Sequence, residues 1–144
     1  MAADDAAVAR LGDFGAGFSG LVSVYVFGSR AEGRAHRESD VDLGVVLDRA
    51  AYPCAAERFE ARLTLTAAAQ TLVGKPTIDL VVLNDAPPTL ARRVMTEGRR
   101  IHCADAHADH AFLRDTMLRA ADLAPFLRRT RRTRLEALLR RPPV

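Results

Sequence analysis

The sequence has few cysteines and no long apolar run, and each absence excludes a class of protein. Cys54 and Cys103 lie far apart and form no Cys-x-x-Cys pair, so neither a disulfide framework nor a zinc ribbon is indicated. No stretch approaches the roughly 18 consecutive apolar residues of a membrane span. The first ten residues are acidic, where a secretion signal would be basic and then apolar. We therefore expect no membrane segment and a cytoplasmic location.

Two common phosphate-binding motifs are also missing. The chain contains neither the Gly-x4-Gly-Lys-Ser/Thr pattern of P-loop proteins nor the Gly-x-Gly-x-x-Gly pattern of dinucleotide-binding folds. By motif the chain is therefore neither a P-loop NTPase nor a Rossmann dinucleotide binder.

The composition is that of one soluble domain. The chain has 144 residues, of which 49% are hydrophobic and 27% charged, which suits a single folded core. Residues 128–144 hold seven arginines and one glutamate, a net charge of +6, whereas residues 1–127 carry a net charge of −3. Such an arginine-rich end is most simply a solvated helix. If it binds a partner, nucleic acid or an acidic protein face is favoured.

Hydrophobic periodicity predicts alternating strands and helices. Glycines at 74 and 98 predict helix ends, and Pro125 predicts a break or kink in the last helix. In that last helix, Leu113, Leu118, Leu123 and Leu127 are interpreted as core positions. We expect helices at 3–14, 55–73, 88–97 and about 107–139, and strands at 21–27, 40–47, 77–83 and, in short form, 100–103. This order predicts an α/β (α+β) fold, with a small mixed sheet flanked by helices.

Acidic residues stand at the start of two predicted strands. Asp40 and Asp42 are two residues apart, so strand alternation sends both side chains to one face, while Val41 and Leu43 face the core. Two carboxylates held this close suit Mg²⁺, which takes one or two protein carboxylates and completes its shell with phosphate oxygens and water. Asp79 lies inside the next apolar strand, and it would complete a three-carboxylate site if the two strands are neighbours.

Gly28 and Ser29 follow the first predicted strand. Glycine lets the backbone approach a phosphate closely, and free backbone N–H groups together with a serine hydroxyl attract anions. This pair therefore predicts a phosphate site beside the carboxylates.

These motifs resemble those of a known superfamily. The segment FGSRAEGRAHRESDVDLGV at 27–45 is similar to the signature of the DNA polymerase β-like nucleotidyltransferases, and IDLVVLNDAP at 78–87 resembles their third acidic strand. The segments APPTLARRVMTEGRRIHCAD and AFLRDTMLRAADLAPFLRR resemble minimal nucleotidyltransferases (MNT) that act as antitoxins beside HEPN-domain ribonuclease toxins. The resemblance implies the polymerase β-like fold, with a catalytic domain at 1–104 and a C-terminal helical extension at 105–144 that packs on a partner or is swapped with it.

The resemblance also implies an activity. The chain would transfer AMP from ATP to a hydroxyl group, a tyrosine of a HEPN toxin, and so neutralise that toxin. Asp40, Asp42 and Asp79 would be the catalytic and metal-binding residues that hold two Mg²⁺ ions, with Asp79 helping to deprotonate the acceptor.

For the nucleotide, the resemblance implies that Gly28 and Ser29 grip the outer phosphates and that Arg30 neutralises phosphate charge. Two other functions stay open from the sequence. One is an antitoxin that acts by binding and occlusion without catalysis. The other is a nucleotidyltransferase for small molecules of the aminoglycoside type, although no substrate domain is evident for it.

Overall fold

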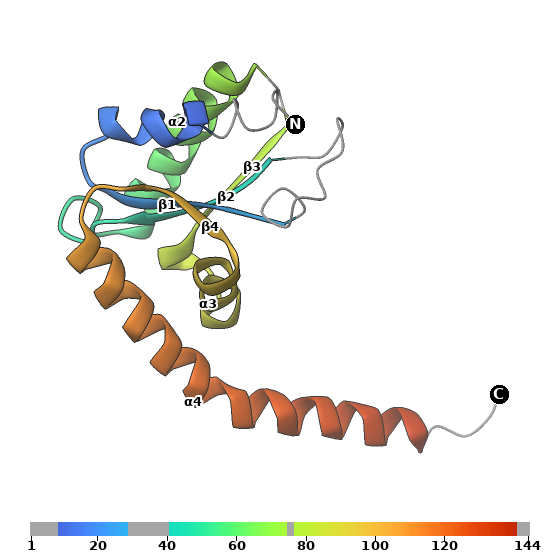
Figure 1. Ribbon diagram of the computed structural model, residues 1–144. Coiled ribbons are helices and arrows are strands. Elements are labelled where there is room, and N and C mark those ends of the chain that lie inside the picture. Colours follow the sequence, from blue (N-terminus) through green and yellow to red (C-terminus); the bar gives the residue numbers. More distant parts are fainter. Residues whose placement is uncertain (1–8, 29–40, 75–76, 141–144) are drawn as a thin grey trace.

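The computed structural model describes residues 9–28, 41–74 and 77–140 (Figure 1). Residues 9–14 are helical and lead into the short 3-10 helix η1, Gly15–Gly17. The strands are β1 Leu21–Phe27, β2 Val41–Leu47, β3 Ile78–Val82 and β4 Arg99–Cys103. The helices are α2 Ala55–Val73, the 3-10 helix η2 Leu83–Asp85, α3 Pro88–Glu97 and α4 Ala106–Leu139. The predicted strands and helices are confirmed within these ranges.

The four strands form one mixed sheet in the order β3-β2-β1-β4. β1 is antiparallel to both of its neighbours, β2 and β4, and β2 is parallel to β3. The parallel pair requires a long crossover connection, which α2 supplies. The predicted α/β fold with a small mixed sheet is confirmed.

Helices cover both faces of this sheet, with α2 on one side and α3 on the other (Figure 1). The α2 side holds the larger core cluster, which includes Val24, Leu43 and Leu65. The α3 side holds a second cluster around Tyr25, Val94 and Phe112. We call this second side the α3 face, and it is the side on which the candidate site lies.

Gly44 lets α3 pack closely against the sheet. A Cβ atom at this position would lie 2.8 Å from Cγ1 of Val94 and 3.2 Å from Cδ2 of Leu83, closer than side chains normally pack. A larger residue in β2 would therefore lift α3 away from the sheet.

Only the first part of α4 packs against the body. Its buried residues are Asp109, Phe112, Thr116 and Ala120, a spacing of three to four that marks one helix face. Figure 1 shows the helix bending partway along and leaving the body, and Pro125 lies within it. Proline removes a backbone hydrogen bond and bends a helix, as the sequence predicted.

The interpretation of the α4 leucines as core residues is wrong for most of them. The side chain of Leu118 is 61% exposed, and Leu123 and Leu127 are also exposed. They lie off the packed face or beyond its last residue, Ala120, so that leucine content alone did not identify the packed positions. Of the helices that the structure describes, none is both long and apolar enough to cross a membrane.

Candidate active site

Asp42 and Asp79 lie side by side on the α3 face. They are direct partners in the register between the parallel strands β2 and β3. Paired residues on adjacent strands point to the same face, so the two carboxylates lie on one face of the sheet. Val41 and Leu43 are buried on the opposite side, as predicted. Asp42 is half-buried and Asp79 is exposed, which leaves the pair open to a ligand.

Gly28 follows the last residue of β1 and lies directly beside Asp42. Its φ angle is +76°, in the left-handed region that side chains disfavour. A Cβ atom added here would collide with Oδ2 of Asp42. Glycine is therefore needed both for the backbone turn and to leave room for the carboxylate. The structure places one member of the predicted phosphate loop against one member of the predicted metal site.

Three predicted site residues, Ser29, Arg30 and Asp40, lie outside the described residues. Within the described ranges, no group of three or more His, Cys, Asp or Glu side chains is arranged to hold a metal ion. The predicted three-carboxylate site depends on Asp40 and stays a prediction. The two carboxylates that are described nevertheless fit Mg²⁺, which needs only one or two protein carboxylates when phosphate oxygens complete its shell.

A hollow of about 220 Å³ lies between the end of β1 and α3. Gly28 lines it from the sheet, while Leu90, Arg93 and Glu97 line it from the helix. Arg93 Nε contacts Glu97 Oε2 at 3.2 Å. No sequence motif pairs Arg93 with Gly28, because only the packing of α3 on the sheet brings the two residues to the same hollow.

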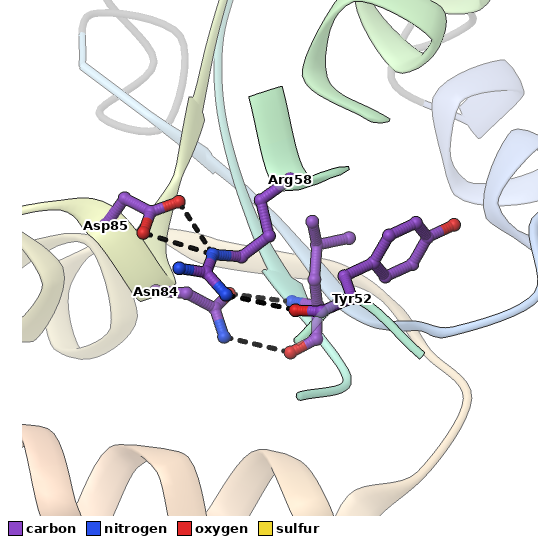
Figure 2. A network of polar contacts seen from close by, with 5 residues as sticks. Tyr52, Arg58, Asn84 and Asp85 are labelled. Carbon is purple, nitrogen blue, oxygen red and sulfur yellow. Dashed lines mark hydrogen bonds and ion pairs between the residues drawn. The ribbon is translucent and has the colours of Figure 1, made fainter. Parts of the chain in front are cut away.

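A polar network fixes β3 against β2 at the end away from the carboxylates (Figure 2). The Asn84 side chain extends the strand pairing, because it accepts from the Leu47 backbone N–H and donates to the Leu47 carbonyl, both at 2.9 Å. Arg58 donates to Asp85 at 2.9 and 3.1 Å and to the Tyr52 carbonyl at 3.0 Å. The Asp85 contact raises the pKa of Arg58. The hydrogen bonds between Asn84 and Leu47 continue the pairing of β2 with the segment that follows β3. They therefore help to fix the register that pairs Asp42 with Asp79.

A third carboxylate on the α3 face is buried. Asp109 of α4 is 3% exposed and accepts hydrogen bonds from Ser23 Oγ at 2.5 Å, from Tyr25 Oη at 2.9 Å and from Arg100 Nη1 at 3.0 Å. Burial, and then the hydrogen bond to Asp109, raise the pKa of Tyr25 well above its ordinary value. The same carboxylate raises the pKa of Arg100. Asp109 therefore joins α4 to β1 and β4, and its donors leave it little capacity to bind a ligand.

Comparisons with known proteins agree with this arrangement. Residues 15–107 match the protein family described as polymerase beta, nucleotidyltransferase. The protein adenylyltransferase MntA of Shewanella oneidensis is 33% identical over 85 residues, which cover 56% of this chain and 53% of MntA. The chain thus spans about half the length of this curated relative.

Solved structures have the same fold. A chain from a toxin-antitoxin crystal structure with AMP-PNP superposes with a TM-score of 0.61 at 23% identity, covering 92% of this chain and 96% of its own length. A chain from a complex of the tri-AMPylated Shewanella oneidensis HEPN toxin with the MNT antitoxin gives a TM-score of 0.52 at 21% identity, covering 85% and 86%. At these identities the likeness establishes the fold.

Proposed function

The chain belongs to the polymerase β nucleotidyltransferase family, and we propose that it is an antitoxin that transfers AMP from ATP to a tyrosine hydroxyl of a HEPN ribonuclease toxin, which is thereby neutralised. The observation that carries this proposal is the pairing of Asp42 with Asp79 directly beside Gly28. The adenylyltransferase MntA, to which the chain is similar, supports AMP as the transferred group. The toxin-antitoxin structures support a HEPN partner and ATP as the donor.

The reaction is a displacement at the α-phosphorus of ATP. The acceptor oxygen forms a new bond to that phosphorus, and the bond from the phosphorus to the oxygen that bridges to the β-phosphate breaks. Pyrophosphate leaves, and the Asp79 carboxylate takes the proton of the acceptor hydroxyl. Asp79 is suited to this role because it is exposed at the edge strand of the sheet, where an acceptor protein has access.

Asp40, Asp42 and Asp79 are the residues proposed to hold Mg²⁺, with two ions expected. When bound, Mg²⁺ neutralises phosphate charge and stabilises the attacking and leaving oxygens. Gly28, with Ser29 and Arg30, is proposed to place the outer phosphates. The contribution of the protein is thus mainly placement and electrostatics.

The test follows the fate of the α-phosphate. The purified chain is incubated with Mg²⁺, a HEPN-domain partner protein and ATP labelled at either the α- or the γ-phosphate. We expect the α-label, but not the γ-label, to appear on the partner, and Asp42→Asn to abolish the transfer. Label found only on an added aminoglycoside would support the small-molecule alternative instead. A HEPN partner that is active as a toxin but stays unlabelled would overturn the proposal.

Neutralisation without catalysis is the second candidate, and the exposed half of α4 favours it as a binding surface. Leu135, Leu138 and Leu139 are exposed there among arginines. Toxin activity in cells that carry the Asp42→Asn variant separates the two functions. Full protection by that variant would assign neutralisation to binding alone, whereas loss of protection with retained binding would assign it to AMP transfer.

A further inference from the structure

A basic side chain to which the sequence assigned no role lines a hollow beside Gly28. Arg93 lines the hollow of about 220 Å³ that Gly28 closes from the sheet. Gly28, which lines this hollow, also lies beside the Asp42 carboxylate, because a Cβ atom at Gly28 would collide with Oδ2 of Asp42. The hollow is therefore lined by the basic side chain of Arg93 and by Gly28, whose neighbour Asp42 belongs to the proposed metal site.

The basic groups of the neighbouring hollow are already in use. A larger space of about 650 Å³ shares Leu90 with the first and is lined by Arg58 and Arg62. Arg58 pairs with Asp85 at 2.9 Å, and Arg62 Nε donates to the Leu80 carbonyl at 2.9 Å. Their positive charge is therefore committed to holding α2 against β3 and η2.

Arg93 is held much more loosely. Its side chain is 72% exposed, and it pairs at 3.2 Å with Glu97, four residues later on the same helix. Exposed pairs of this spacing are weak in water, so an anionic ligand can take the place of Glu97. A guanidinium group offers several donors in a planar fork, which matches the oxygens of a phosphate group.

We propose that Arg93 binds the outer phosphates of the nucleotide in the hollow between Gly28 and α3, and that Glu97 holds the guanidinium when no nucleotide is bound. This inference rests on the proposed function for the presence of a nucleoside triphosphate. It assigns a phosphate contact to α3, the helix that follows the third acidic strand. Arg93 exchanges its partner Glu97 for phosphate, and Glu97 opposes phosphate binding through its own negative charge.

The test measures binding without the partner protein. Dissociation constants for AMP-PNP and for inorganic tripolyphosphate are measured by calorimetry in the presence of Mg²⁺. We expect Arg93→Ala to weaken both by about tenfold and Arg93→Lys to weaken them by about threefold, because lysine keeps the charge but loses the fork. Arg92→Ala is the matched control, since Arg92 is the adjacent exposed arginine of α3 and is not among the residues that line the hollow. It should stay within about twofold of the wild type.

Glu97→Gln should have the opposite effect on phosphate binding. Removal of the competing carboxylate should tighten tripolyphosphate binding by about twofold to threefold, and this gain should vanish in the Arg93→Ala background. Unchanged binding in Arg93→Ala, an equal loss in Arg92→Ala, or no tripolyphosphate binding by the wild type would each overturn the inference. A loss for AMP-PNP but not for tripolyphosphate would place the contact on the nucleoside and would also overturn it.

These results stay separable from the proposed function. If the wild type binds tripolyphosphate through Arg93 but transfers no AMP to the HEPN partner, the proposed function fails and the phosphate contact stands. If AMP transfer is intact while Arg93→Ala binds like the wild type, the phosphate contact alone fails.

Discussion

Asp79 and Asp109 both lie on the α3 face of the sheet, but one is exposed and the other is buried. Asp109 is buried, and a serine, a tyrosine and an arginine donate hydrogen bonds to it. Asp79 is exposed and stands in register with a second carboxylate, Asp42. A buried carboxylate with several donors stabilises the fold, whereas two carboxylates in register on one face of a sheet suit the binding of a cation. The same residue type thus has a structural role at one place and a proposed catalytic role at the other.

The largest expected effect is on activity at the exposed carboxylates. Asp79→Asn keeps the shape but loses the negative charge and the proton acceptor, so AMP transfer should fall at least about 100-fold, which corresponds to about 3 kcal/mol of barrier. The free energy of unfolding should stay within about 0.5 kcal/mol, because the side chain is exposed. Initial rates of label transfer and urea unfolding measure the two quantities. A large loss of stability would place Asp79 with Asp109 as a structural residue.

Removal of the buried carboxylate should have the reverse profile. Asp109→Ala leaves the hydroxyls of Ser23 and Tyr25 and the guanidinium of Arg100 without their acceptor, so the free energy of unfolding should fall by about 3 kcal/mol. Asp122→Ala, an exposed aspartate of the same helix, is the control and should change stability by less than about 0.5 kcal/mol. Urea titrations at pH 7 compare them. Equal stability of the two variants would contradict a structural role for Asp109.

The sequence predicted the strands and marked Asp42 and Asp79 as candidate ligands, because strand alternation and the Gly-Ser and Asp-x-Asp motifs are local patterns. Whether Asp79 lies beside Asp42 depends on the parallel pairing of β2 with β3. From the sequence alone this pairing could be assumed but not predicted. Asp109 and Arg93 were not predicted as functional residues. Each acquires its role from contact between segments distant in the chain, and no local pattern distinguishes Arg93 from its neighbour Arg92.

The close contact between Gly28 and Asp42 predicts an intermediate effect. Gly28→Ala should lower the free energy of unfolding by about 1 to 2 kcal/mol, because the left-handed φ strains the alanine and its Cβ meets Asp42. Gly74→Ala is a matched control, since Gly74 has a φ of +71° but no atom within 4 Å of an added Cβ. Gly74→Ala should lower the free energy of unfolding by about 1 kcal/mol, because it carries the backbone strain alone. Only Gly28→Ala should also reduce AMP transfer, and an equal loss of transfer in both variants would argue against a specific contact between residue 28 and Asp42.

The smallest expected effect concerns a single donor to the buried carboxylate. Tyr25→Phe removes one hydrogen bond from Asp109 while Ser23 and Arg100 remain, so the free energy of unfolding at pH 7 should fall by about 1 kcal/mol. The raised pKa of Tyr25 means that the folded state holds the phenol proton more tightly than the unfolded state. This contribution to stability is fully present below the unfolded pKa of about 10 and is lost as the pH rises through the folded value. The difference in stability between the wild type and Tyr25→Phe should therefore be constant from pH 7 to 9 and shrink above about pH 10. Urea titrations across this range measure it, and a difference that grows with alkaline pH would show that the phenol ionises more easily in the folded protein than in the unfolded chain.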